Sequence, residues 1–447
     1  NPQNNLISLR EALEMTVPRI VVFAVGGLFD IGSDDYASIK LNRTNSNFTI
    51  ACQTAPPPGV NIRGSGIYMN GVSNTIWRHC TFRGNDPGRG DSESSRNFSI
   101  IGTSDRAENH IFDHISLSWG VDENGGAFNG PSTDSSKGVK YLTIQQSIIS
   151  EGDADSTHSE SGQLPTRYTH AMGPSCNSAK AGIPVQGCSI NKNFIAHNAR
   201  RNPMMKGTVG EVLNNIIYNY HETGIRLSDN QNAGGSVNVF DNYLRRGPNT
   251  KSNALDFENY LSTSNDSYNI DNNILEGVGE IGSSTLKTTL SLKAAVEDIN
   301  VLRQQGGDHL RCIGASRPQR DVIDQRVIDE YHARGGQVGI FSNHTRDYSM
   351  YPTSATRHLW LDSDKDGLPD TWESKYGVDD PTAHDLDPRY ENIEIYANRL
   401  AECPMITITA PLAGTAIDMN STDITIQYDS QWETWPDGQQ IELCSSP

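Results

Sequence analysis

Several features that often decide a protein's class are missing from this chain of 447 residues. It has no run of 18 or more apolar residues, which argues against a membrane-spanning helix. Lys and Arg total only 36 against 54 Asp and Glu, a net charge of −18, so nucleic acid is a poor partner. None of the seven cysteines stands in a CxxC pair, which argues against zinc and thioredoxin-like chemistry.

The cysteines are spaced instead as structural disulfides. Cys176 and Cys188 bracket a short loop, and Cys403 and Cys444 bracket the last segment. We expect both pairs to form in an oxidising compartment, although spacing alone leaves the connectivity open. The chain begins Asn1-Pro2-Gln3 without an initiator Met or a signal-peptide pattern, so we expect a processed or trimmed N-terminus on a secreted, monomeric protein.

A repeated pattern of strand, polar turn and strand runs through the first two-thirds of the chain. Successive units are 22 to 47 residues apart, a period typical of a right-handed parallel β-helix in which the longer steps carry loops. An antiparallel sandwich would need turn signals every 8–12 residues or so. The units are 75–82, 110–117, 142–148, 190–195, 212–217, 237–244 and 268–275.

Asparagine recurs in the turns of these units, and we expect it to form an inward ladder of amides. Asn tolerates left-handed backbone geometry, and its amide can satisfy the backbone groups of a turn. The residues concerned are Asn193, Asn214, Asn215, Asn242 and Asn273.

The pattern of apolar residues changes after residue 290. Leu292–Leu302 and Val322–Tyr331 have helical spacing and are expected to cover the β-helix, and 406–410 and 423–427 alternate as strands do. We therefore divide the chain into a β-helix (1–290), a helical and irregular segment (291–352), an Asp-rich segment (353–400) and a short β module (401–447). The predicted class is all-β.

The Asp-rich segment has the order expected of a calcium loop. Asp362, Asp364 and Asp366 alternate before Gly367, and Asp370 follows. Oxygen ligands at alternate positions and a glycine for a sharp turn suit Ca²⁺. We predict a structural calcium site here, against the alternative of a solvated acidic loop.

Basic residues gather beside the long inter-coil steps. Arg200, Arg201 and Lys206 lie together, and Arg226, Arg245 and Arg246 follow one and two coils later. Equivalent positions on neighbouring coils are about one strand spacing apart. A row of cations in an acidic protein predicts a track for a polyanion, against the alternative of ordinary solvated charge.

Separated motifs in one order give the sequence a family likeness. They are 8–12 (SLREA), 21–23 (VVF), 49–56 (TIACQTAP), 113–123 (DHISLSWGVDE), 196–203 (AHNARRNP) and 314–321 (GASRPQRD), followed by the Asp-rich loop. In these motifs the chain resembles the pectate lyases of polysaccharide lyase family 1, particularly their bacterial, multi-domain branch. The resemblance leaves residues 403–447 uncovered.

The resemblance implies β-elimination on an acidic polysaccharide. In that reaction a base removes the proton α to a uronate carboxylate, and a cation must stabilise the charge that develops. Arg201-Asn202-Pro203 matches the family's Arg-x-Pro-x-x-Arg motif, so it implies catalytic roles for Arg201 and for Lys206, which replaces the second Arg. An arginine is ordinarily protonated, so Arg201 is either a perturbed base or an electrostatic stabiliser.

The resemblance also implies a catalytic Ca²⁺, held by Asp86, Asn97, Asp122 and Glu123. Asn97 is a departure, because an Asp is usual there. The family's substrate-binding Lys has no counterpart, and the matching region holds only His158 and His170. A histidine contact would make binding depend on pH. Trp119 and Arg226 complete the expected substrate-binding set.

The function predicted from the sequence is a secreted lyase for pectate or a related polyuronate, assisted by Ca²⁺. The alternatives are a lyase for another polyuronate or methylated pectin, a β-helix glycoside hydrolase, and a non-catalytic glycan-binding protein. A hydrolase needs two carboxylic acids flanking the bond, and Asp-Asp pairs occur only at 34–35 and 379–380, outside the central coils. Nucleic acid and membranes are not expected partners.

Overall fold

A computed structural model describes residues 7–32, 39–84, 96–132, 134–155, 170–179, 182–228, 234–260, 267–277, 279–283, 320–339, 348–349, 351, 356–357, 361–401, 406–410 and 427–430. Each coil of the chain adds one strand to each of three stacked columns, and the strands within a column pair in parallel. The predicted all-β parallel β-helix is confirmed.

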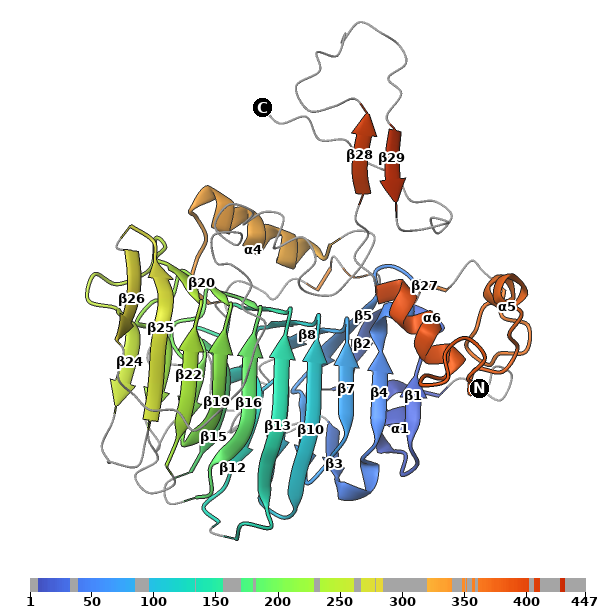
Figure 1. Cartoon of the computed structure of the whole chain (residues 1–447), viewed down its shortest axis with the longest axis horizontal. Coiled ribbons are helices and arrows are strands. Elements are labelled where there is room, and N and C mark those ends of the chain that lie inside the picture. Colours follow the sequence, from blue (N-terminus) through green and yellow to red (C-terminus); the bar gives the residue numbers. More distant parts are fainter. Residues whose placement is uncertain are drawn as a thin grey trace, which may run out of the picture.

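The first column stands in front in Figure 1, from β1 at the right to β25 at the left. Its strands are β1 (Arg19–Val21), β4 (Phe48–Ala51), β7 (Thr75–Arg78), β10 (Arg106–Asp113), β13 (Gly138–Gln145), β16 (Val185–Asn191), β19 (Thr208–Leu213), β22 (Ser236–Phe240) and β25 (Ser267–Leu275). The second column follows after a tight turn. Its strands are β2 (Val25–Asp30), β5 (Val60–Gly64), β8 (Thr81–Gly84), β11 (Ser116–Ser118), β14 (Ile148–Ser150), β17 (Phe194–Ala196), β20 (Ile216–Tyr218) and β23 (Tyr243–Arg245).

The third column forms a sheet of its own and carries most of the predicted site residues. Its strands are β3 (Ile39–Asn42), β6 (Ile67–Asn70), β9 (Phe98–Ile101), β12 (Glu123–Asn129), β15 (Met172–Ser178), β18 (Met204–Lys206), β21 (Thr223–Ser228) and β24 (Leu255–Tyr260). Alternate residues of all three columns point inward and stack in one continuous core, which includes Trp77, Phe112, Ile144, Ile190 and Val212.

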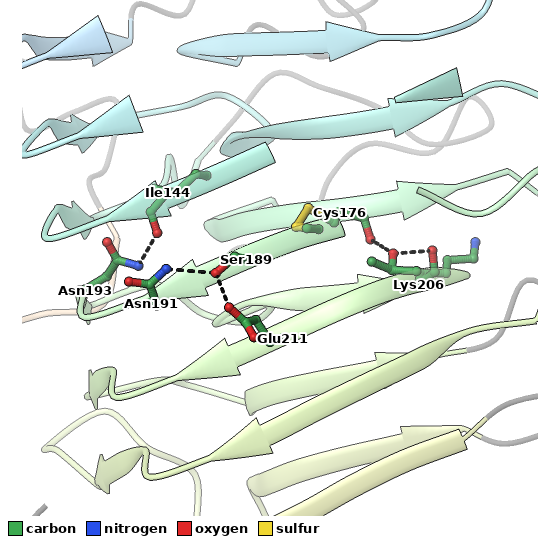
Figure 2. Close-up of a disulfide and its surroundings, with 9 residues drawn as sticks. Ile144, Cys176, Ser189, Asn191, Asn193, Lys206 and Glu211 are labelled. Atoms are coloured by element: carbon green, nitrogen blue, oxygen red, sulfur yellow. Dashed lines mark hydrogen bonds between the residues drawn. A yellow bond between two sulfur atoms is a disulfide. The ribbon is translucent and has the colours of Figure 1, made fainter. Parts of the chain in front are cut away.

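Inward amides hold the turns between the first and second columns. The Asn193 Nδ2 donates to Asn215 Oδ1 at 3.1 Å, and the contact repeats from Asn215 to Asn242 and from Asn242 to Asn273 at 2.9 Å. Each Nδ2 also donates to a backbone carbonyl, as Asn193 does to Ile144 in Figure 2. The predicted ladder is therefore confirmed for these four residues.

Asn214 is a correction to that ladder. It adopts a left-handed backbone (φ 53°) one residue before the ladder position, as Lys192 and Asp241 do in their coils. Its Oδ1 is buried without a hydrogen-bond partner, so Asn214 is not part of the amide column. Left-handed residues recur at this level because the chain must change direction within two residues in each coil. Asn and Gly adopt that geometry at the lowest energetic cost.

Two disulfides lie within the β-helix. Cys176 and Cys188 join β15 to β16 across the core with a Cα–Cα distance of 6.6 Å (Figure 2), as predicted. The second joins Cys52 and Cys80 in neighbouring coils and was missed, because 28 residues separate the two in sequence. The predicted pair Cys403 and Cys444 lies outside the described residues.

The helix α4 (Val322–Ala333) covers the outer face of the second column and confirms the predicted helix. Val327, Ile328 and Tyr331 pack on residues of β14, β17 and β20. Asp321 caps the first turn and, with Asp324, pairs with the fully buried Arg83 of β8 at 2.8 and 3.1 Å. The helix predicted at 292–302 lies outside the described residues.

The remaining elements lie at the ends of the chain. They are α1 (Leu9–Glu14), the 3₁₀ turns η1 (Arg43–Asn45) and η2 (Cys52–Thr54), β26 (Gly279–Ser283), β27 (Thr356–Arg357), α5 (Asp370–Tyr376), α6 (Asn392–Ala401), β28 (Ile406–Ala410) and β29 (Gln427–Ser430). The segment with α5 and α6 packs on Ile20 and Val22 beside β1 (Figure 1). β28 and β29 pair with each other; the predicted strand at 423–427 lies outside the described residues except for Gln427. The predicted domain boundaries stay predictions. No helix among the described residues is long and apolar enough to cross a membrane.

The amide ladder predicts a strong effect of Asn215→Ala. The change leaves the backbone N–H of Asn193, the amide of Asn193 and the carbonyl of Ile190 without their contacts to Asn215. Buried groups that lose their partners cost about 1–3 kcal/mol, so the free energy of unfolding in urea, followed by tryptophan fluorescence, should fall by about that amount. Gln186→Ala, an exposed amide on the neighbouring β16, should change it by less than about 0.5 kcal/mol. Equal effects of the two variants would contradict the ladder's role.

Candidate functional site

The candidate site lies at the turns that lead into the third column. Arg96 comes directly before β9, Asp122 and Glu123 stand at the start of β12, His170 precedes β15, and Arg201 precedes β18. These strands belong to four consecutive coils, β9 to β12 to β15 to β18. Coils are about 4.8 Å apart, so long side chains from separate coils can meet.

A second ladder of amides positions these turns. Asn97 Nδ2 donates to the Asn124 side chain at 3.3 Å, and Asn124 Nδ2 donates to Asn198 Oδ1 at 3.0 Å. The Asn202 amide then contacts the carbonyl of Asn198 at 3.3 Å. All four are buried. The turns of three separate coils are thereby held at one level of the β-helix.

Arg201 has a backbone conformation that points its side chain back toward β12. It is left-handed (φ 59°) and precedes the cis peptide bond between Asn202 and Pro203. Its guanidinium pairs with Glu123 Oε1, two coils away. The side chain is 16% exposed, so it is reachable from outside while its partner Glu123 is buried. The structure thus brings together Arg201 and Glu123, which the sequence assigned to one site.

Arg96 joins this pair and was not assigned any role from the sequence. Its Nε pairs with Glu123 Oε2, and a terminal nitrogen pairs with Asp122 Oδ2. His170 Nδ1 lies 3.4 Å from the other oxygen of Asp122. The signal that could have pointed to Arg96 is its place directly before Asn97, at a position where the resemblance expects ligands.

The charged groups of this cluster shift the pKa values of Asp122 and Arg96. Burial by itself would raise the pKa of Asp122, but Arg96, His170 and Arg201 hold it well below its usual value. Burial would likewise lower the pKa of Arg96, and the carboxylates of Glu123 and Asp122 raise it instead. Asp122 and Arg96 therefore stay ionised together in a largely buried place.

This cluster decides whether the implied calcium ion fits. Both oxygens of Glu123 are taken by Arg201 and Arg96, and both oxygens of Asp122 contact Arg96 or His170. Ca²⁺ needs six to eight oxygen ligands without competing cations beside them. The pair in this arrangement does not fit the ion. A catalytic calcium there remains a prediction of the resemblance alone.

Asn97, another expected ligand, is turned into the β-helix. Its Nδ2 lies 3.2 Å from the carbonyls of Ser118 and Asn124, so its observed part is to support the turn. Asp86 and His158 lie outside the described residues. His170 is 1% exposed, and its observed contact is with Asp122 instead of a surface open to substrate.

Trp119 is also buried, with 2% of its surface exposed. Its Nε1 donates to Glu151 Oε2 at 3.1 Å, and Glu151 in turn pairs with Arg326 of α4 at 2.8 and 2.9 Å. The ring therefore anchors its turn to α4. For Trp119 to contact substrate as predicted, its contacts with Glu151 and α4 would have to break.

Three arginines of the predicted row of cations lie in ion pairs. Arg200 pairs with Glu222 at 3.1 Å, Arg226 with Glu258 at 3.5 Å and Arg246 with Asp256 at 2.7 Å. Arg245 lies on β23, pairs with Glu276 and faces Tyr331 of α4, so it belongs to another face. The sequence showed the arginines, but their acidic partners come from later coils.

Lys206 and Arg226 remain on the outer face of the third column. Met205 and Leu227 pair in register and point into the core, so their neighbours on β18 and β21 point outward. Lys206 is the last residue of β18, at the end away from the turn that carries Arg201. It therefore lies along the same face as Arg201 but outside the ion-paired cluster.

The Asp-rich loop forms a separate acidic group. Ligand atoms of Asp362, Asp364 and Asp366 lie within 4.8 Å of one another. Burial and the neighbouring carboxylates raise the pKa of Asp362 and of Asp366, and Asp366 Oδ2 is buried without a hydrogen-bond partner. Three converging carboxylates with an orphaned oxygen fit a Ca²⁺ ion. Asp370, the fourth expected ligand, instead accepts hydrogen bonds from Ser363 at 2.7 Å.

Comparison with known proteins identifies the family. No protein-family model matches the chain. A "Probable pectate lyase C" of Aspergillus flavus is 30% identical over 415 residues, covering 88% of this chain and 86% of that protein. One of Emericella nidulans is 30% identical over 409 residues, covering 88% and 85%. The solved thermostable pectate lyase PL 47 is 13% identical, with a TM-score of 0.45 over 68% of this chain and 86% of its own, too slight a likeness to carry an argument.

These curated relatives are fungal, so the predicted bacterial, multi-domain branch is not confirmed. The likeness extends along most of both sequences. The chain therefore belongs to the pectate lyase family of polysaccharide lyases.

Proposed function

We propose that this chain is a secreted lyase that cleaves pectate, or a closely related polyuronate, by β-elimination. The observation that carries the proposal is the convergence of two guanidinium groups, Arg96 and Arg201, at the turns of the third column. The relatives named pectate lyase are similar in sequence to this chain over most of its length. Pectate is a polyanion, and its carboxylates are the groups that guanidinium ions bind best.

The chemistry explains why cations are needed. In β-elimination a base takes the proton from the carbon α to the carboxylate, the electrons of that C–H bond form a double bond, and the C4–O bond breaks as the leaving oxygen takes a proton. Negative charge builds on the carboxylate before the C4–O bond is lost. Fixed positive groups in a partly buried site stabilise that charge without reorganising, which is the largest single contribution in many enzymes.

Arg201 is assigned the electrostatic role in the resting enzyme. Its guanidinium is held against the buried carboxylate of Glu123. A role as the base requires Arg201 first to leave Glu123 and give up its proton. Lys206 and Arg226, along the same outer face, are assigned to binding the carboxylates of neighbouring sugar units.

The alternative of a glycoside hydrolase finds less support at this site. Hydrolysis needs a protonated carboxylic acid and a second carboxylate on opposite sides of the bond. Asp122 and Glu123 are adjacent in sequence and share Arg96. The pKa of Asp122 is lowered, the opposite of what a general acid requires. A purely glycan-binding protein would form no unsaturated product, and the lyase assay below distinguishes it.

The covalent structure supports an extracellular location. Cys52–Cys80 and Cys176–Cys188 are both disulfides, which persist in oxidising compartments and rarely in the cytosol. We propose that the chain acts as a monomer on a polymer outside the cell.

The Asp-rich loop is proposed as a structural calcium site. It packs through Leu368 and Ile393 against Ile20 and Val22 of the first coil. Binding an ion there would relieve the repulsion among Asp362, Asp364 and Asp366 and fix the loop on the end of the β-helix. The loop packs on the first coil, whereas Arg201 precedes β18 of the sixth coil, so we assign its ion no part in the chemical step.

Arg201→Ala tests the proposed function. Loss of one preorganised donor typically lowers kcat by about 10²–10³, so kcat/KM on polygalacturonate should fall by at least about 100-fold. The measurement is the ultraviolet absorbance of the unsaturated product, with reducing ends as the second readout. Arg106→Ala, an exposed arginine on β10 of the first column, should keep the rate of the unchanged protein. Undiminished turnover in Arg201→Ala on every polyuronate would end the proposal.

Asp364→Asn tests the calcium loop. A ligand at 100 times its Kd stabilises the folded protein by about 2.7 kcal/mol, so Ca²⁺ should raise the unfolding midpoint of the unchanged protein and raise it far less in Asp364→Asn. Differential scanning calorimetry with and without Ca²⁺ measures this. Asp134→Asn, an exposed aspartate in another loop, should respond as the unchanged protein does. An equal response of Asp364→Asn would show that calcium acts elsewhere.

A further inference from the structure

We propose that Arg96 is the resident counter-cation of Asp122 and Glu123 and that it keeps a divalent ion out of this pair. The inference rests on the proposed function and deepens it, because it names the group that supplies positive charge where the family resemblance expects calcium. It concerns a residue to which neither the sequence motifs nor the comparisons give a role.

Arg96 is built into the site as a bridge. It uses two different nitrogens on two different carboxylates, Nε on Glu123 and a terminal nitrogen on Asp122. A planar guanidinium is suited to such two-point contact, whereas a metal ion would need both carboxylates to turn toward one centre. Arg96 therefore holds the two side chains at a spacing set by its own fork.

Neighbouring groups restrict the position of Arg96. Its guanidinium carbon lies 4.1 Å from the centre of the Phe128 ring, a cation–π contact from β12. Its backbone carbonyl passes so close to Gly66 that a Cβ there would lie 1.7 Å from the oxygen. Gly66 also has φ +91°, which other residues rarely adopt. The side chain is only 15% exposed, so it does not swing freely in solvent.

The charge balance explains why an ion is excluded. Asp122 and Glu123 contribute two negative charges, and Arg96 and Arg201 contribute two positive ones, so the four groups sum to zero. A calcium ion would add two further positive charges within a few ångströms of both guanidinium groups. In a poorly solvated place that repulsion is strong. Removing Arg96 leaves the carboxylates with an excess negative charge, which is what a divalent ion requires.

The consequence for catalysis is a built-in cation that needs no loading. Arg96 and Arg201 lie on either side of Glu123 and would both face the uronate carboxylate as charge develops. The rate of elimination would then not depend on an ion at this pair. Any effect of Ca²⁺ on the protein would come through another place, such as the Asp-rich loop.

Calcium binding by isothermal titration calorimetry tests this on the full-length chain. Arg96→Gln should bind one more Ca²⁺ per molecule than the unchanged protein, and Arg96→Gln/Glu123→Gln should lose that additional site. Arg96→Lys keeps the positive charge and should bind as the unchanged protein does. Arg106→Gln, on the first column, controls for removing a surface arginine. Because only differences in stoichiometry are compared, ions at the Asp-rich loop cancel.

A second measurement keeps Arg96 in place and so does not depend on any Arg96 variant folding. Glu123→Gln alone should not lower its calcium stoichiometry, because no ion is bound at Glu123 while Arg96 is present. Loss of one site in Glu123→Gln, or equal binding by Arg96→Gln and the unchanged protein, would overturn the proposal. Calorimetry needs no turnover. A chain inactive on all polyuronates would therefore refute the proposed function and leave this inference to be judged on binding.

Discussion

Every part of this molecule depends on coils stacking in register. A parallel strand pairs with its neighbours above and below, so a shift of one residue in any coil would turn core side chains to the solvent. The tight turns fix that register, because their backbone groups are buried and must find partners. Asn193, Asn215, Asn242 and Asn273 satisfy them with side-chain amides, each joined to the next coil.

The same device supports the candidate site from below. Asn97, Asn124 and Asn198 form a second column of amides under the turns that carry Arg96, Asp122 and Arg201. Residues more than a hundred positions apart are thereby held at one level. A site that must place two guanidinium groups around one carboxylate gains its precision from this rigid support.

The charged groups of the cluster stabilise one another. A buried carboxylate without a cation, or a buried guanidinium without an anion, is strongly unfavourable, and removal of one partner of a buried pair costs about 3–5 kcal/mol. Glu123 is 1% exposed and contacts two arginines, so neither contact is a passing surface encounter. The charged groups are therefore fixed before any substrate arrives.

Much of this fold could be predicted from the sequence because its signals are local. The strand–turn–strand unit, the asparagine of the turn and the helix at 322–331 each depend on residues within a few positions of one another. The Cys176–Cys188 disulfide spans only 12 residues. The assignment of Arg201 to the site came from a short motif. These predictions needed no knowledge of how distant coils align.

What could not be predicted depends on that alignment. Arg201 meets Glu123 across 78 residues and Arg83 meets Asp321 across 238, and the loops between them vary in length. The sequence shows that Arg200, Arg226 and Arg246 are basic but not that Glu222, Glu258 and Asp256 face them. Arg96 was overlooked for the same reason, since its importance comes from carboxylates one coil away.

These pairings also change how an acidic protein can hold an acidic polymer. A bare row of cations would attract a polyanion from a distance, but paired arginines have little long-range field, and salt screens what remains within about 8–10 Å. Under the proposed function, the third column recognises its ligand by close contact, through guanidinium groups that exchange a protein carboxylate for a sugar carboxylate or share it with one. Such an exchange keeps the charge balance of the outer face of the third column nearly constant. It favours ligands whose carboxylates repeat at a spacing that the coils can match, and a polymer of uronic acids has that regularity.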